Sequence, residues 1–115
     1  MNLRYIYKII KNEEWIKAKS NRCFSGSSKD IKDGYIHFSG EEQLEETLKK
    51  YYPNQTNLIL LKIDTLSLDH LLWEQTSDGN FFPHLYSTLE ISSVIKEIAI
   101  TQKNGQNILP NIFKK

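Results

Sequence analysis

The segment from Leu58 to Ile63 constrains the fold of this chain most strongly. It reads Leu-Ile-Leu-Leu-Lys-Ile and is the most apolar run in the sequence. A short, continuous run of this kind is typical of a strand that is buried on both faces. We therefore expect this segment to form a central strand of a sheet. No apolar run in the chain approaches the roughly 20 residues that a membrane-spanning helix needs.

Further strands are indicated on both sides of this run. Residues 3–10 alternate with a period of two, which is typical of a strand. The other candidate strands, in chain order, are 34–38, 71–75, 81–86 and 95–101, of which the last is expected to end the sheet. Asp78-Gly79 is a strong hairpin signal, and Asn104-Gly105 marks a turn. Pro83 cannot donate a ladder hydrogen bond, so we place it at an edge or a bulge.

Two helices are predicted in the first half of the chain. Asn12 can cap the first helix, in which Trp15 and Ala18 share a face that packs on the sheet. Ser39 and Glu42 have the spacing of a capping box, so the second helix is expected to begin at Ser39. It should end before residues 53 and 54, which are Pro and Asn.

Residues 20–33 are rich in Ser, Gly, Lys and Asp and are predicted to form a long, irregular loop, which in a compact domain is often functional. The pattern as a whole predicts five or six strands and two clear helices, with the helices early and the strands late. That order favours an α+β fold over repeated βαβ units. At 115 residues, the chain is expected to form a single domain over residues 1–115.

The composition narrows the classes of partner and compartment. Fifteen basic and fourteen acidic residues leave a net charge of +1, which argues against a dedicated nucleic-acid or membrane-surface protein. A lone Cys23 cannot form an intramolecular disulfide, which fits a reducing compartment. Residues 1–11 do not have the pattern of a signal peptide. We therefore expect a cytoplasmic protein that binds neither nucleic acid nor membrane.

A first group of candidate site residues lies in the segment Asp33-Gly34-Tyr35-Ile36-His37-Phe38-Ser39. Along a strand, His37 and Ser39 share one face, while Ile36 and Phe38 can face the core. An imidazole and a hydroxyl just before a helix could bind an anionic ligand. The alternatives are that His37 is a hydrogen-bonded, half-buried histidine and that Ser39 is only a helix cap, which we favour for Ser39.

A second group lies in two later strands. Glu74 sits on an apolar strand and needs either a partner or solvent, so it could be a general base, a ligand of a ribose, or an exposed charge at an edge. His84 and Tyr86 share a face of the segment that follows the hairpin. Phe81 and Phe82 are assigned to the core. The third histidine, His70, lies in a polar loop and is interpreted as incidental.

A metal site is ranked low. His37, His84 and Glu74 together would provide two imidazoles and a carboxylate, which is a known ligand set. No His-x-His or His-x-x-x-His spacing supports it, and we predict no metal.

Several of these segments resemble the bacterial domain-of-unknown-function family 952. They are Ile6-Tyr7-Lys8-Ile9, Trp15 with Ala18, Asp33 to Ser39, Leu72-Trp73-Glu74 and Phe82-Pro83-His84-Leu85-Tyr86. The match runs in order over roughly residues 3–100, and Ser87-Thr88 stands where the family usually has a glycine. The resemblance implies a fold like that of the ADP-ribosyltransferases, with a split, mostly antiparallel β core of five to six strands and two or three helices, and a cleft that holds NAD in active relatives.

Three hypotheses for function follow from the residues and this resemblance. The first is an NAD-dependent transferase or glycohydrolase in which Glu74, His37 and His84 are catalytic and His37, Ser39 and Tyr86 bind NAD. Tyr86 would stack on the nicotinamide, Glu74 would contact the ribose, and residues 23–33 could close over the ligand. The second is a non-catalytic module that binds a nucleotide or another small metabolite. The third is a hydrolase or a metal-assisted enzyme that uses His37, His84 and Glu74.

Overall fold

The computed structural model describes residues 3–110 of the chain. This part of the chain combines strands with three α-helices, so the predicted α+β class is confirmed, and its strand pairs are antiparallel. The elements, in chain order, are β1 (Tyr5–Lys11), α1 (Asn12–Asn21), β2 (Cys23–Phe24), α2 (Ser28–Asp33), β3 (Ile36–His37), the 3-10 helix η1 (Glu41–Gln43), α3 (Leu44–Tyr51), β4 (Leu58–Asp64), η2 (Thr65–Ser67), β5 (Leu71–Gln75), β6 (Phe81–Leu85), β7 (Leu89–Glu90), η3 (Ile91–Ser93), β8 (Val94–Lys103) and β9 (Gln106–Ile108). Among these residues, no helix is long and apolar enough to cross a membrane.

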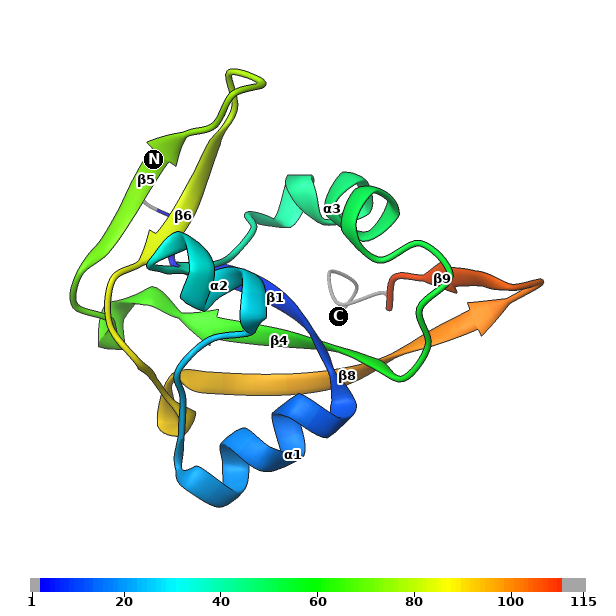
Figure 1. Cartoon of the computed structure of the whole chain (residues 1–115), viewed down its shortest axis with the longest axis horizontal. Coiled ribbons are helices and arrows are strands. Elements are labelled where there is room, and N and C mark those ends of the chain that lie inside the picture. The colour runs from blue at the N-terminus through cyan, green and yellow to red at the C-terminus, as the bar shows by residue number, and fades with distance from the viewer. Residues whose placement is uncertain (1–2, 111–115) are drawn as a thin grey trace.

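The main sheet has the strand order β1-β4-β8-β9, with α1 on one side and α3 on the other (Figure 1). Alternate residues of β4 face the two sides. Leu61 packs in the cluster that contains Trp15 of α1, and Leu60 packs in the cluster that contains Leu44 of α3. The prediction of a central strand buried on both faces is therefore confirmed, because each face of β4 is covered by a different helix.

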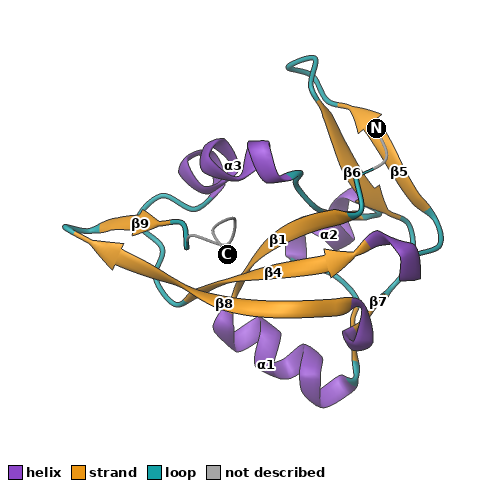
Figure 2. Ribbon diagram, turned by 180° about the vertical axis from the view of Figure 1, so that it is seen from behind, coloured by secondary structure: helices purple, strands orange, loops and turns teal. Residues whose placement is uncertain are grey.

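A second sheet has the order β3-β6-β5 and stands beside the first, as the view from behind shows (Figure 2). β5 and β6 form the hairpin predicted from Asp78-Gly79, with Gly79 at φ +90°. The two sheets are joined at one isolated bridge, in which the amides of Tyr7 and Ser39 each donate to the other residue's carbonyl at 2.8 Å. A separate pair, β2 and β7, lies near the end of α1.

The placement of Pro83 at an edge or a bulge is wrong, because β6 is the middle strand of its sheet and Pro83 pairs regularly with Trp73. The Pro83 carbonyl accepts a hydrogen bond from the Phe38 amide. In an antiparallel ladder a residue's nitrogen and carbonyl point to the same side. The nitrogen of Pro83 therefore faces the point where β3 ends, after His37, and a missing donor is tolerated there.

Both predicted helix caps differ from the structure. Asn12 is the first residue of α1, and the Lys11 cap position makes no side-chain cap hydrogen bond. Ser39 does not cap the second helix, because its backbone is held in the bridge to β1. The helical segment starts at η1 with Gly40 as the cap residue, and the Gly40 amide donates to the Gln43 side chain at 2.8 Å.

The predicted irregular loop over residues 20–33 is also largely wrong. It contains the end of α1, the strand β2 and the helix α2. α2 adds a third α-helix to the two that the sequence pattern predicts, within the two or three that the family resemblance implies. α2 begins with a capping box, in which the Ser27 amide donates to the Asp30 carboxylate and the Asp30 amide donates to the Ser27 hydroxyl. Gly34 ends α2 at φ +89°, a conformation that favours glycine.

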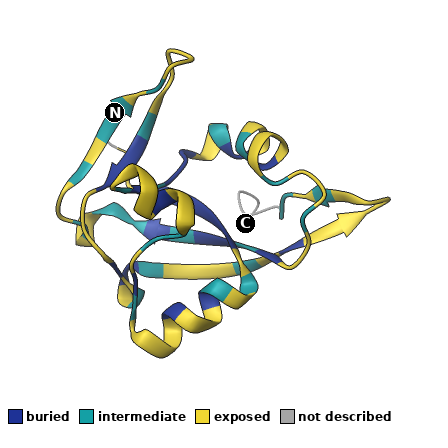
Figure 3. Ribbon diagram, in the orientation of Figure 1, coloured by how far each residue is buried: buried dark blue, intermediate teal, exposed yellow. Residues whose placement is uncertain are grey.

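Two further predictions are corrected at the end of the chain and in the hairpin. β9 follows β8 after the turn at Asn104-Gly105, so the segment 95–101 does not contain the last strand. Phe81 is 38% exposed and does not belong to the core, and Phe82 is half-buried. The buried residues concentrate where the two sheets meet the helices, whereas the tip of the hairpin is exposed (Figure 3).

Candidate functional site

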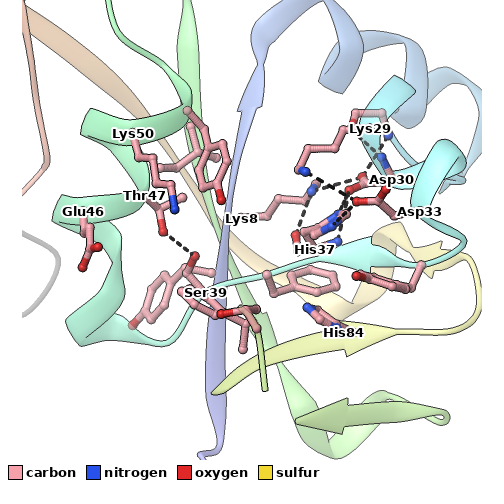
Figure 4. Close-up of a pocket in the computed structure, with 18 of the residues that line it drawn as sticks. Lys8, Lys29, Asp30, Asp33, His37, Ser39, Glu46, Thr47, Lys50 and His84 are labelled. Atoms are coloured by element: carbon pink, nitrogen blue, oxygen red, sulfur yellow. Dashed lines mark hydrogen bonds and ion pairs between the residues drawn. The ribbon is translucent and has the colours of Figure 1, made fainter. Parts of the chain in front are cut away.

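A cavity of about 290 Å³ opens between α2 and α3, with β1 at its floor (Figure 4). Its walls come from segments far apart in the sequence. Residues from β1, α2, the β3 segment, α3 and the β5–β6 hairpin line it, among them Lys8, Lys29, Asp30, Asp33, Tyr35, His37, Ser39, Thr47, Lys50, Phe82 and His84. The volume lies at the small end of the roughly 300–1,000 Å³ that small-molecule sites occupy.

One wall is built around a buried ion pair between Lys8 of β1 and Asp30 of α2. Lys8 is 6% and Asp30 2% exposed, and Lys8 Nζ lies 3.2 Å from Asp30 Oδ2. The ammonium also donates to the His37 carbonyl at 2.8 Å. Asp30 Oδ1 accepts from the His37 amide at 3.1 Å and lies 2.6 Å from His37 Nδ1. A single carboxylate thus joins α2 to β1 and to β3.

Burial and charge act in opposite directions on this pair. Burial works to raise the pKa of Asp30, but the hydrogen bond with His37, the charge of Lys8 and two backbone amides prevail and hold that pKa well below its usual value. Burial lowers the pKa of Lys8, and Asp30 opposes that effect. We interpret the two groups as a charged pair, because each offsets part of the other's cost of burial.

His37 is held from both sides. Its Nε2 lies 3.0 Å from a carboxylate oxygen of Asp33, at the exposed end of α2. Asp33 also forms an ion pair with Lys29 at 3.4 Å. Because Asp33 is 31% exposed, a ligand could displace it from the imidazole, whereas Asp30 is fixed in the interior.

The second histidine has its own carboxylate. His84 Nδ1 lies 2.9 Å from Glu74 Oε1, and the Tyr86 hydroxyl donates to the same oxygen at 2.5 Å. These hydrogen bonds from Tyr86 and His84 lower the pKa of Glu74, and the bond to Glu74 raises the pKa of Tyr86 to about 12. Since Nδ1 of His84 is engaged by Glu74, Nε2 is the nitrogen left for a ligand.

Tyr35 links the two imidazoles. Its ring stacks on His84 with 4.0 Å between centroids and 18° between planes, and lies 4.7 Å from the ring of His37. The centroids of the two imidazoles are 5.5 Å apart. Two carboxylate-supported histidines therefore face one cavity, with an aromatic ring between them.

The structure brings together most of the residues predicted from the sequence. His37, Ser39 and His84 line the cavity, and Glu74 and Tyr86 lie behind His84 and are not among the lining residues. His37 and Glu74 do not contact each other in any described interaction, because His37 is paired with α2 instead. His70 is exposed and lies apart from the cavity lining.

Sequence reasoning missed Lys8, Asp30 and Asp33. The sequence pattern places Lys8 in an alternating strand that belongs to the family resemblance, Asp30 in the predicted loop, and Asp33 at the start of the first candidate segment, without indicating a role for any of the three. The Ser27-x-x-Asp30 spacing could have predicted α2, since Ser followed by an acidic residue three positions later is a capping-box signal. Within residues 3–110 no group of three or more His, Cys, Asp or Glu side chains is placed to hold a metal ion.

The fold and the site together describe an α+β protein with a cavity that is lined by two histidines, each in contact with a carboxylate. Residues 9–97 match the family described as a protein of unknown function, DUF952, and the chain belongs to this family. It is similar to protein CC0527 from Caulobacter crescentus, whose crystal structure has 40% identity and a TM-score of 0.86 over 90% of this chain and 93% of that chain. The solution NMR structure of CC0527 gives 39% identity and a TM-score of 0.81 over 91% of each chain. No curated protein matches the chain.

Proposed function

We propose that the cavity binds a nucleotide, with NAD as the first candidate, and that its ribose and nicotinamide end lies against His37 and His84. The observation that carries the proposal is the pair of imidazoles, 5.5 Å apart, each supported by a carboxylate and both lining one cavity. Carboxylates that fix the tautomer and orientation of an imidazole are a recurrent feature of acid–base and ligand-binding sites. Tyr35 adds an aromatic surface beside both rings.

The size of the cavity limits how a dinucleotide could bind. A volume of about 290 Å³ suits one nucleoside-sized part of a ligand and not a whole dinucleotide. In this proposal the nicotinamide riboside half occupies the cavity and the remainder extends along its open side. The division of the strands into a four-stranded and a three-stranded antiparallel sheet supports an ADP-ribosyltransferase-like fold as the framework.

The chemistry assigned to the site is cleavage of the bond between nicotinamide and ribose. Nicotinamide leaves, positive charge develops on the ribose, and water or an acceptor hydroxyl adds to the anomeric carbon while an imidazole takes its proton. Glu74 acts through His84, which it orients by the contact with Nδ1. The carboxylate is therefore a positioning group in this proposal, and Tyr86 supports it from the outer side.

A non-catalytic binding module is the second candidate. It is favoured by the fact that both nitrogens of His37 lie within hydrogen-bond distance of carboxylates, while Glu74 is not among the cavity-lining residues. A site of this kind would bind and release a nucleotide without cleaving it. Release of nicotinamide from NAD, measured on wild type and Glu74→Gln, separates the two: turnover that falls in the variant supports the enzyme, and binding without turnover supports the module.

Binding itself is tested by a thermal-shift titration with NAD, ADP-ribose and nicotinamide. Ligand at 100 times its dissociation constant stabilises the folded protein by about 2.7 kcal/mol. His37→Asn should abolish the shift, because it removes the ring but keeps a donor for Asp30. His70→Asn is the matched control, since His70 is exposed at φ +67°, where Asn is tolerated. No shift in the wild type with any of the three compounds would refute the nucleotide proposal.

A further inference from the structure

The cavity has a second polar end, on the α3 side, away from the two imidazoles. Ser39 is 5% exposed, and its Oγ lies 3.1 Å from Thr47 Oγ1. In the described part of the chain, this contact is the only side-chain hydrogen bond of either residue. Each hydroxyl has one donor and two acceptor sites, and their mutual bond uses only one of the two donors. One hydroxyl proton therefore remains for a ligand inside the cavity.

Lys50 brings a positive charge to the same end. It lies one turn after Thr47, so both side chains project from the same face of α3, and Figure 4 shows both reaching toward Ser39. Among residues 3–110, Lys50 forms no ion pair; its Nζ lies 5.3 Å from the centre of the Tyr51 ring. Lys29 of α2 approaches the same ring at 5.5 Å from the opposite wall. Two ammonium groups thus converge at the mouth of the cavity.

None of the carboxylates around the cavity forms an ion pair with Lys50 within residues 3–110. Asp33 is engaged by His37 and Lys29. Asp78 accepts hydrogen bonds from the Thr76 hydroxyl and the Asn80 amide within the hairpin, and these bonds lower its pKa more than the charge of Lys50 does. Glu46 is exposed, and Figure 4 shows its carboxylate on the outer side of α3. The Lys50 ammonium, which has no ion pair in the described residues, lies on the same side of the cavity as a buried hydroxyl donor. A ligand that suits both groups is an anion with several acceptor oxygens, such as a phosphate.

We infer that Ser39, Thr47 and Lys50 form a phosphate subsite, so that the protein selects phosphorylated nucleosides over nucleosides. This inference rests on the proposed nucleotide function and adds the orientation of the ligand. The sugar lies toward His37 and His84, and the phosphate lies toward α3. Lys29, on the opposite wall, would approach a second phosphate when the ligand carries a diphosphate.

Calorimetric titration of the full chain with nicotinamide mononucleotide and with nicotinamide riboside tests the subsite. The wild type should bind the mononucleotide at least about tenfold more tightly, the effect of one charged hydrogen bond. Lys50→Gln should remove that preference and leave riboside affinity unchanged. Lys49→Gln is the matched control, because Lys49 is exposed on the same helix and does not line the cavity. Equal wild-type affinities, or a preference that survives Lys50→Gln, would overturn the inference.

Inorganic pyrophosphate separates failure of the subsite from failure of the nucleotide proposal. If neither nicotinamide compound binds, the nucleotide proposal is overturned, and the subsite is judged on pyrophosphate alone. Pyrophosphate binding that is lost in Lys50→Gln and weakened in Thr47→Val would uphold an anion site at α3. Absence of pyrophosphate binding, or binding equal in wild type and Lys50→Gln, would overturn it.

Discussion

Replacement of Lys8 by Met should destabilise the protein far more than the loss of a surface lysine. Lys8 is 6% exposed, and its ammonium lies 3.2 Å from Asp30 and 2.8 Å from the His37 carbonyl. Methionine fills most of the same space but removes the charge, so the Asp30 carboxylate stays buried without that partner. Removal of one member of a buried ion pair costs about 3–5 kcal/mol.

The expected loss lies at the lower end of that range, about 3 kcal/mol, because Asp30 keeps other partners. The Asp30 carboxylate still contacts the Ser27 amide at 2.9 Å, the His37 amide at 3.1 Å and the His37 ring at 2.6 Å. For a domain of this size, 1 kcal/mol changes the melting temperature by about 4 °C, so we expect a decrease of about 12 °C. Urea unfolding followed by tryptophan fluorescence measures the free energy directly.

Lys11→Met is the control for this experiment, since Lys11 is exposed at the end of the same strand. It should change the free energy of unfolding by no more than about 0.5 kcal/mol. The double variant Lys8→Met/Asp30→Asn should lose less stability than the sum of the two single variants, because the buried charges disappear together. A loss under about 1 kcal/mol for Lys8→Met would refute the reasoning, since a pair that contributes so little behaves like an exposed one.

Three further outcomes are expected. The pKa of Asp30 is lower in the folded protein than in the unfolded chain, where it is near 4. The ionised carboxylate therefore stabilises the fold fully above about pH 4, and this stabilisation is lost as the pH falls further. Asp30→Asn should flatten the acid side of a plot of unfolding free energy against pH. Gly26→Ala should destabilise the protein more than Gly79→Ala in urea unfolding. Both glycines have a positive φ, but a Cβ at Gly26 would lie 2.9 Å from the Asp30 Cβ, whereas a Cβ at Gly79 would meet no atom within 4 Å. Glu74→Gln should return the Tyr86 phenol from a pKa of about 12 toward its ordinary value near 10, as an ultraviolet titration of tyrosinate would show; an unchanged titration would contradict the contact.

The sequence predicts those parts of the fold in which local pattern and tertiary packing agree. The apolar run at Leu58–Ile63 is a buried central strand because both of its faces meet helices. The alternation in 3–10, the hairpin at Asp78-Gly79 and the shared face of Trp15 and Ala18 are also confirmed. In each case the local signal and the tertiary packing favour the same structure.

The capping-box signal shows where this agreement ends. The same spacing occurs at Ser27–Asp30 and at Ser39–Glu42, and only the first is a capping box. Ser39 cannot serve as a cap because its backbone pairs with Tyr7, a residue 32 positions earlier, and this constraint is not visible in the local sequence. Tertiary pairing thus moved the start of the helical segment beyond Ser39.

Part of the candidate site was predictable from the sequence, namely His37, Ser39 and His84, whereas Lys8, Asp30 and most of the contacts were not. The period of two places His37 and Ser39 on one face, and in the structure both line the cavity. It places His84 and Tyr86 on one face as well, and both contact Glu74. The pairing of His37 with Asp30 could not be predicted in this way. It depends on how α2 packs against β1, which is set by the buried Lys8 and not by any spacing in the chain.

The bridge between Tyr7 and Ser39 also covers part of the open edge of the main sheet. β1 is an end strand of the main sheet, and unpaired amides and carbonyls on such a strand can template the addition of a strand from another molecule. Ser39 occupies the amide and the carbonyl of Tyr7, at 2.8 Å each, in the middle of that edge. The segment that carries Ser39 into the cavity therefore also obstructs edge-to-edge aggregation. The same few backbone atoms thus hold Ser39 at the cavity and close the middle of an exposed sheet edge.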